Sequence, residues 1–599
     1  MFICTRSFFP LLACLLTLAL VTPSAACAAA ACGPGSAVQI WTAPLAAQPG
    51  EPLQIMAVAT DGALDGLSVV DPGGRQLDLT VTHGGGPPWS LRGTLPAPAR
   101  GSYRIEALRG GRPAACSEVG IGASGNRGSG TWDQSTQAFF AAWVEQLFDA
   151  PPEQSLSFPS LEPVLRDPQR NFLYDYLRKG EDLRVAAEPD CADLAYFLRA
   201  YFAWKLGLPV SFRACGRGSA TSPPRCDAPE IDRSFVGTAA SADTFRRVSR
   251  RIMDRVTSGG GRTALDDSGT DFYPVPLERN ALWPGTVYAD PYGHTLMIVK
   301  WVPQTATRDG LLLAVDAQPD NSVARKRFWE GTFLFARTPS AGPGFKAYRP
   351  PLPGGPQGSP VPPANGTLTG RAGLPPYSGS QENLEPAEFY ARMEKLINPR
   401  GLDPEAAYEA MLAALMEQLE TRVQSVANGE DYMRSHPGAV VPMPKGPAIF
   451  ETVGPWEDYA TPSRDMRLLI ALKVLEGLPE RIRKHPELYV LKQLFGLKSE
   501  SAAEAAARIE QLHARRIREK FITYTRSDGS PFRLSLADIY ARRPGLEVAY
   551  NPNDCVERRW GAAPGLPDFG TCRRQAPSDQ RTRMEEYRPW FHEARRPPR

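Results

Sequence analysis

Residues 188–210 read EPDCADLAYFLRAYFAWKLGLPV, and this stretch carries the strongest fold signal in the chain. Pro189 and Asp190 predict a turn followed by the start of a helix. The helix is apolar on nearly every face, which predicts a buried central helix, and Gly207 is expected to end it. Cys191 would then stand at or beside the first turn, where exposed backbone N–H groups and the helix dipole favour a thiolate.

The N-terminus is typical of an exported protein of bacterial type. Arg6 precedes an apolar run, Phe8–Val21, and small residues follow it. This is the pattern of a secretory signal, which we assign to residues 1–31. No later stretch is long and apolar enough to span a bilayer, so no transmembrane helix is expected in the mature chain. The mature protein is predicted to be periplasmic or secreted. Lipid anchoring at Cys27 is the alternative, because SAAC, which ends at this cysteine, loosely resembles a lipobox.

Export makes the cysteine count informative, since thiols outside the cytoplasm tend to form disulfides. Of the ten cysteines, seven follow the predicted signal. Six of them form three pairs by position, each enclosing a β-rich segment or a loop rich in Pro and Gly: Cys32–Cys116, Cys215–Cys226 and Cys555–Cys572. Cys191 is left over, and an odd cysteine in an exported chain is a candidate reactive thiol.

The remaining chain divides into regions of different pattern. Residues 32–123 contain short alternating strands, which predict an immunoglobulin-like β-sandwich. Residues 131–337 begin with helical patterns and end in strands, which predicts an α+β domain. Residues 338–384 are rich in Pro, Gly and Ser and are predicted to be an extended linker. Residues 385–599 are mostly helical in pattern and end in a basic tail held by Cys555–Cys572. The net charge of +3 gives no reason to expect a nucleic-acid partner.

A thiolate nucleophile needs a base, and His294 is the candidate. It is the histidine, of six in the chain, that shares the region 131–337 with Cys191, and it opens an apolar strand after Gly293. Asp316, at the end of the next apolar strand, could orient the imidazole and stabilise its cation. Gln318 is the alternative third residue, because an amide can also orient a histidine. No His pair at ligand spacing and no Gly-rich phosphate loop is found, so neither a metal nor a cofactor is expected.

These residues resemble a known family. Cys191, the apolar helix and the Gly-Leu-Pro turn at residues 207–209 are similar to the transglutaminase-like fold, as are His294, Trp301 and Val315-Asp316 in order along the chain. The resemblance implies a papain-like fold and a Cys-His-Asp triad that transfers acyl groups from amides. The chain departs from the family pattern in the long interval between Cys191 and His294 and in the Ala317-Gln318 that replaces the usual proline. Asp190-Cys191 and the GHTLMI stretch at 293–298 also resemble NlpC-type cell-wall endopeptidases, more weakly.

The expected function is therefore an exported thiol enzyme that acts on amide bonds of peptides or proteins through a thioester, with hydrolysis favoured over cross-linking. One alternative is an NlpC-type peptidoglycan endopeptidase. Another is a non-catalytic envelope binding or scaffold protein with a degenerate transglutaminase-like fold, in which the C-terminal helices contact an envelope protein partner. The expected substrate is a peptide, a protein or a peptidoglycan peptide.

Overall fold

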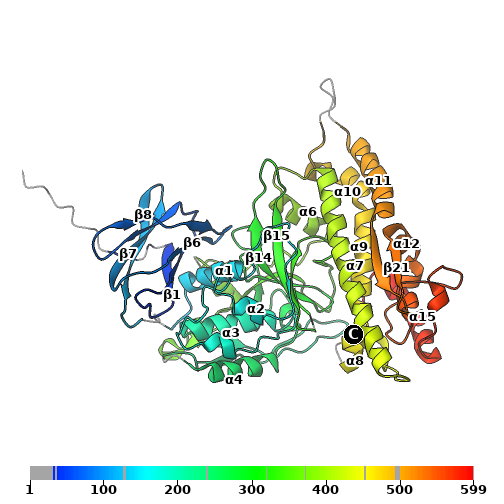
Figure 1. Ribbon diagram of the computed structural model, residues 1–599, viewed down its shortest axis with the longest axis horizontal. Coiled ribbons are helices and arrows are strands. Elements are labelled where there is room, and N and C mark those ends of the chain that lie inside the picture. The colour runs from blue at the N-terminus through cyan, green and yellow to red at the C-terminus, as the bar shows by residue number, and fades with distance from the viewer. Residues whose placement is uncertain are drawn as a thin grey trace, which may run out of the picture.

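The chain folds into three successive regions, which lie in sequence order along the long axis of the molecule (Figure 1). The computed structural model describes residues 32–597, apart from residues 34, 36, 126–129, 238–239, 319, 372, 451–453 and 493–499. The predicted signal at residues 1–31, with Cys27, lies outside the described residues. No helix in the described part of the chain combines the length and apolar character needed to cross a membrane.

Two four-stranded antiparallel sheets form the N-terminal region, in the orders β1-β2-β6-β5 and β4-β3-β7-β8. Strand β7 alternates buried and more exposed positions, because successive side chains of a strand point to opposite faces, whereas six of the seven residues of β2 are buried. Leu53, Ile55 and Ile105 are fully buried in the core that the two sheets share. The strands are β1 (Val38–Ala43), β2 (Leu53–Ala59), β3 (Gly66–Val70), β4 (Gln76–Leu77), β5 (Val81–His83), β6 (Trp89–Leu95), β7 (Gly101–Arg109) and β8 (Arg112–Ile121).

A seven-stranded antiparallel sheet forms the centre of the molecule, in the order β12-β17-β13-β14-β15-β16-β9. Its strands are β9 (Ser157–Phe158), β12 (Phe272–Pro274), β13 (Val287–Ala289), β14 (Thr295–Val302), β15 (Leu311–Ala317), β16 (Val323–Arg327) and β17 (Gly344–Tyr348). Two short pairs lie outside it, β10 (Val210–Phe212) with β11 (Glu230–Asp232) and β18 (Leu352–Pro353) with β19 (Pro360–Val361). Because the sheet is antiparallel throughout, neighbouring strands bring a strand start and a strand end to the same edge.

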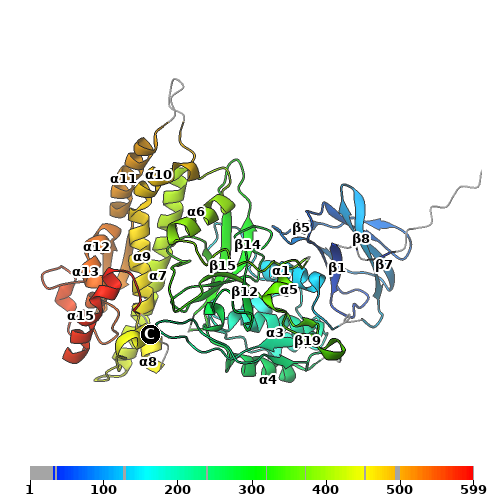
Figure 2. The ribbon, with the colours of Figure 1, turned by 180° about the vertical axis from the view of Figure 1, so that it is seen from behind.

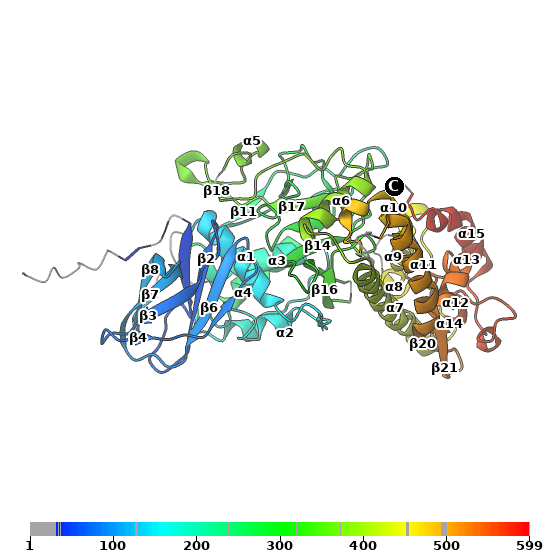
Figure 3. The same cartoon turned by 90° about the horizontal axis from the view of Figure 1, so that it is seen from above.

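The helices of the central region are α1 (Gln134–Leu147), α2 (Glu162–Leu165), α3 (Leu194–Leu206), α4 (Ala242–Met253), α5 (Asn365–Leu368) and α6 (Pro386–Ile397). Twelve of the thirteen residues of α3 are buried, as its apolar sequence predicts, and Gly207 ends it in the left-handed conformation with φ 72°. Tyr196 of α3 packs edge-on against Phe272 and Tyr348 of the sheet. Helix α1 lies between the N-terminal strands and the central sheet (Figure 3).

The prediction of an extended linker at residues 338–384 is wrong, because part of this segment belongs to the central sheet. Strand β17, within this segment, lies between β12 and β13 in the central sheet, and all five of its residues are buried. The central core also continues through Phe389 and Met393 of α6, beyond the predicted boundary at 385. The Pro and Gly content hid a strand of only five residues, because a run this short leaves little alternation to detect.

The C-terminal region is mainly helical and has a second hydrophobic core, formed by residues from Leu402 onward together with Trp329 of the central region. Figure 2 shows its long helices side by side on the opposite side of the central sheet from the N-terminal strands. Arg422 and Asp465 form a bidentate ion pair inside this core, with both distances 2.8 Å. The helices are α7 (Pro404–Ser435), α8 (Gly454–Tyr459), α9 (Pro462–Glu476), α10 (Leu478–Lys484), α11 (Ala502–Glu519), α12 (Leu536–Ala541), α13 (Arg543–Leu546), α14 (Val556–Arg559) and α15 (Ser578–His592), and the hairpin is β20 (Phe521–Thr525) with β21 (Pro531–Ser535).

The disulfides confirm the cysteine pairing expected from the sequence. Cys32–Cys116, Cys215–Cys226 and Cys555–Cys572 are bonded. Cys191 is the free cysteine of the described residues. Disulfides of this kind fit an exported protein.

Candidate active site

Cys191 lies in a turn that leads directly into α3. The Asp190 carboxylate accepts hydrogen bonds from the backbone N–H of Ala192 at 2.7 Å and of Asp193 at 3.0 Å. Asp190 thus acts as the cap of this turn, as its position before the helix suggests. The helix proper starts three residues after Cys191, at Leu194, and the cysteine side chain is partly exposed.

The β14–β15 hairpin brings His294 and Asp316 together. His294 immediately precedes β14, after Gly293, whose φ of 107° is a conformation that favours glycine. Asp316 is the next-to-last residue of β15. Strand pairing places these two positions at the same edge of the sheet, and His294 Nε2 lies 3.2 Å from Asp316 Oδ2.

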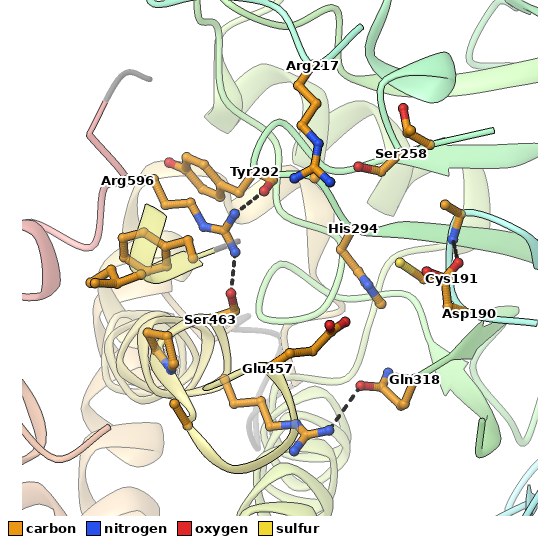
Figure 4. A pocket seen from close by; sticks show the side chains of 18 of the residues that line it. Asp190, Cys191, Arg217, Ser258, Tyr292, His294, Gln318, Glu457, Ser463 and Arg596 are labelled. Carbon is orange, nitrogen blue, oxygen red and sulfur yellow. Dashed lines mark hydrogen bonds between the residues drawn. The ribbon is translucent and has the colours of Figure 1, made fainter. Parts of the chain in front are cut away.

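The imidazole of His294 points toward the sulfur of Cys191 (Figure 4). The strand is also tied to the cysteine through its backbone, because the Thr295 hydroxyl donates a hydrogen bond to the carbonyl oxygen of Cys191. Since Asp316 engages Nε2, the other ring nitrogen, Nδ1, is the one that can exchange a proton with the thiol. The structure therefore brings the three residues predicted from the sequence into one cluster.

The electrostatics of the cluster favour a charged imidazole. Burial lowers the pKa of His294, and the nearby Arg467 lowers it further, but Cys191 and Asp316 together raise it to about 9. Burial raises the pKa of Asp316, yet its hydrogen bond with His294 and the charge of Lys326 hold that pKa below its usual value. An imidazolium between a sulfur and a carboxylate is the arrangement that stabilises a thiolate nucleophile.

Gln318 lies behind Asp316 and does not contact the imidazole of His294 directly. Its Nε2 donates to Asp316 Oδ2 at 2.7 Å, and its Oε1 accepts from Arg464 at 3.3 Å. The carboxylate oxygen that contacts His294 is therefore also held by the glutamine amide. Of the two alternatives for the third residue, Asp316 touches the imidazole and Gln318 touches Asp316.

A cavity of about 280 Å³ opens beside Cys191 and His294. Its walls come from both the central and the C-terminal regions, so the site lies where the two regions meet. The C-terminal wall includes Trp456, Glu457, Arg464, Arg467 and Arg596. The described segment after α15 runs back beside α8 to this boundary (Figures 1 and 2).

The arginines of this wall were missed by the sequence reasoning. Arg464 and Arg467 lie on α9, and Arg596 follows α15, all far along the chain from Cys191. The chain contains 68 Lys and Arg residues, so nothing local distinguishes these three from the others. Only the docking of the C-terminal region against the sheet brings them to the cavity.

A cluster with metal-ligand residue types lies elsewhere. The side chains of Cys555, Glu557 and Cys572 approach within 4.8 Å of one another. The two sulfurs are joined in a disulfide, so they do not offer the thiolates that bind metal ions. This cluster is therefore structural.

Comparisons with known protein families, with curated proteins and with solved structures find no match to this chain. The geometry and charges of the site are accordingly the basis for any functional conclusion. Fold likeness would in any case not fix the chemistry, because function depends on the site.

Proposed function

We propose that the protein is an exported thiol enzyme that acts on amide bonds through Cys191, His294 and Asp316, on a transglutaminase-like, papain-like fold. The observation that carries the proposal is the single hydrogen-bonded cluster of the free cysteine, a histidine with a pKa of about 9 and a buried aspartate. Cys191 and His294 line one cavity, with the buried Asp316 behind the imidazole, and perturbed titration in a cavity is typical of catalytic groups. The immunoglobulin-like N-terminal sandwich would serve as a spacer or binding module.

The chemistry follows from these positions. The Cys191 thiolate attacks the amide carbonyl carbon and forms a C–S bond, and the oxygen takes the negative charge. The backbone N–H of Cys191, beside the start of α3, is the candidate donor to that oxygen. The His294 imidazolium then gives its proton to the leaving nitrogen, the C–N bond breaks, and a thioester remains.

Neutral His294 next takes a proton from water, the hydroxyl adds to the thioester, and the acid leaves with return of the Cys191 thiolate. An amine in place of water would give transfer instead of hydrolysis. Asp316 keeps the imidazole oriented and stabilises its cation throughout. We favour hydrolysis, since water needs no second binding site.

Alkylation of the native protein tests the triad. Iodoacetamide at pH 6.5 should modify one thiol, which peptide mass spectrometry should locate at Cys191. The rate should fall by about tenfold or more in His294→Ala, because a free thiol has a pKa near 8.5 and is mostly protonated at this pH. His485→Ala is the matched control, since that histidine is on the surface of the C-terminal region and pairs with Glu487.

Two product assays then separate the enzyme classes. Incorporation of a fluorescent amine into casein measures transfer, and new amino termini from casein or from peptidoglycan peptides measure hydrolysis. Each activity must be lost in Cys191→Ala to be assigned to this site. An unreactive Cys191, or a rate independent of His294, would overturn the triad and favour the non-catalytic envelope protein.

A further inference from the structure

We infer that the cavity beside Cys191 binds a carboxylate of the substrate through Arg464, Arg467 and Arg596, so that the cleaved amide lies within one or two residues of that carboxylate. This inference rests on the proposed function, because it names the substrate class of the same site. It assigns a role to the C-terminal region, which supplies these three of the cavity's arginines, whereas Arg217 comes from the central region.

The hydrogen bonds of two of these arginines go to neutral oxygens. Arg596 donates to the carbonyl oxygen of Tyr292 and to the hydroxyl of Ser463 (Figure 4). Arg464 donates to the hydroxyl of Ser425 and to Gln318. Neither forms an ion pair with a carboxylate of the described chain.

Arg467 has a carboxylate partner but is incompletely satisfied. Its Nη2 lies 3.0 Å from Oδ2 of the fully buried Asp290. Its Nε is buried without a hydrogen-bond partner among the described residues. Asp290 also accepts the backbone N–H of Tyr292, so it is shared with the turn before His294.

The three cations therefore repel one another in a confined space. Burial and then the charge of Arg467 lower the pKa of Arg596 to about 9. Burial lowers the pKa of Arg464 as well, against the opposing charges of Asp320 and Asp316, and Arg467 adds to the lowering. Sequestered charges of one sign are unfavourable without counter-charges. A bound anion would supply the missing partner, and guanidinium groups suit the geometry of a carboxylate.

The acidic residues of the cavity do not fill this role. The Asp190 carboxylate is occupied by the backbone N–H groups of Ala192 and Asp193. Burial and the nearby Asp190 and Asp254 raise the pKa of Asp193 to about 8, so it is mainly neutral at pH 7. Glu457 lines the cavity but forms no ion pair with the three arginines among the described residues, and burial raises its pKa.

The contacts fix how close the anion lies to the reacting bond. Arg596 contacts Tyr292, two residues before His294, and Arg464 contacts Gln318, which holds Asp316. The cavity of about 280 Å³ is near the small end of ligand pockets. A short peptide end or an acidic side chain next to the cleaved amide fits these limits, and peptides carry their negative charge as carboxylates.

The test compares two alkylating reagents of similar size, iodoacetate and neutral iodoacetamide. Their rate ratio at Cys191 reports the local positive charge, whereas the iodoacetamide rate alone reports the thiolate of the proposed function. Arg596→Ala and Arg464→Ala should each lower the iodoacetate-to-iodoacetamide ratio by about threefold to tenfold, as expected for loss of one nearby charge in a partly buried site. Arg595→Ala is the control, because that neighbouring side chain is 74% exposed and pairs with Glu593.

Three peptides then identify the source of the carboxylate by protecting Cys191 from iodoacetamide. Ala-Ala-Ala with a free carboxyl end tests a terminal carboxylate, Ala-Glu-Ala-amide tests a side-chain carboxylate, and Ala-Ala-Ala-amide is the neutral control peptide. Stronger protection by either acidic peptide than by the neutral peptide, lost in Arg596→Ala or Arg464→Ala, supports the inference. An iodoacetamide rate that shows a working thiolate, together with a ratio unchanged by both variants, overturns it and leaves the triad intact.

Discussion

Replacing Asp316 with asparagine removes one negative charge from the triad with little change in side-chain size. Two donors, His294 Nε2 at 3.2 Å and Gln318 Nε2 at 2.7 Å, converge on Asp316 Oδ2. The other oxygen, Oδ1, is buried without a hydrogen-bond partner among the described residues. An asparagine with its carbonyl oxygen at the Oδ2 position would keep both contacts, so the variant tests the charge rather than the geometry.

The expected change in the pKa of His294 follows from its hydrogen bond with residue 316, which loses the carboxylate charge in the asparagine variant. Such bonds contribute about 1.5–3 kcal/mol, which corresponds to a fall of about one to two pH units in the pKa of His294. The wild-type value is about 9. A less stable imidazolium stabilises the thiolate less, and we expect the alkylation of Cys191 at pH 6.5 to slow by at most the same factor, about tenfold to a hundredfold.

The assay is the rate of iodoacetamide alkylation of Cys191 from pH 4 to pH 10, with circular dichroism to confirm folding. The profile of Asp316→Asn should move to higher pH. Asp320→Asn is the control, because this exposed carboxylate caps the following turn by accepting from the backbone N–H of Ser322. Superimposable profiles for wild type and Asp316→Asn would refute the role of the carboxylate charge.

Three further predictions concern neighbouring interactions. Gln318→Ala should slow the alkylation of Cys191 at pH 6.5 by about twofold to tenfold, because it removes one neutral hydrogen bond to Asp316. If the glutamine acts through that carboxylate, the same change should have no added effect in the Asp316→Asn background. Because the pKa of His294 is raised from 6.5 to about 9, its charge stabilises the fold by about 3 kcal/mol below pH 6.5. This stabilisation is lost as pH rises through about 9, so the difference in urea unfolding between wild type and His294→Gln should shrink over that range, and a constant difference would contradict the assignment. Arg422→Ala should destabilise the C-terminal region by about 3–5 kcal/mol in thermal unfolding, because it leaves the buried Asp465 unpaired, and Arg422→Met combined with Asp465→Leu should recover most of the loss.

The parts of the site that depend on local patterns could be predicted from the sequence. The apolar run of α3 and its terminal Gly207 are local signals, and both describe the observed helix. The pairing of the remaining cysteines singled out Cys191. Two apolar strands joined by a short connection predict a hairpin, which is why His294 and Asp316 could be expected at one edge.

The C-terminal wall could not be predicted, because it depends on contacts between distant segments. Arg464 of α9 donates a hydrogen bond to Gln318, which follows β15. The local sequence around either residue gives no sign of this contact, because it depends on how the two elements pack. The choice between Asp316 and Gln318 was open for a similar reason, since the side-chain directions depend on strand register. Strand β17 was missed because its partners, β12 and β13, come from well before it in the chain.

The two hydrophobic cores on either side of the cavity have a consequence for turnover. The central core ends near Ile397, and the C-terminal core consists of Trp329 and of residues from Leu402 onward. Each region therefore has a core of its own, and Trp329 is the residue that the central region contributes to the C-terminal one. Relative motion is the ordinary behaviour of such units. A peptide larger than the cavity would have to enter by a hinged opening around this short connection, and release of product would need the same movement. Opening would then be a step of every catalytic cycle, and it would set the number of cycles per second if it were slower than bond cleavage.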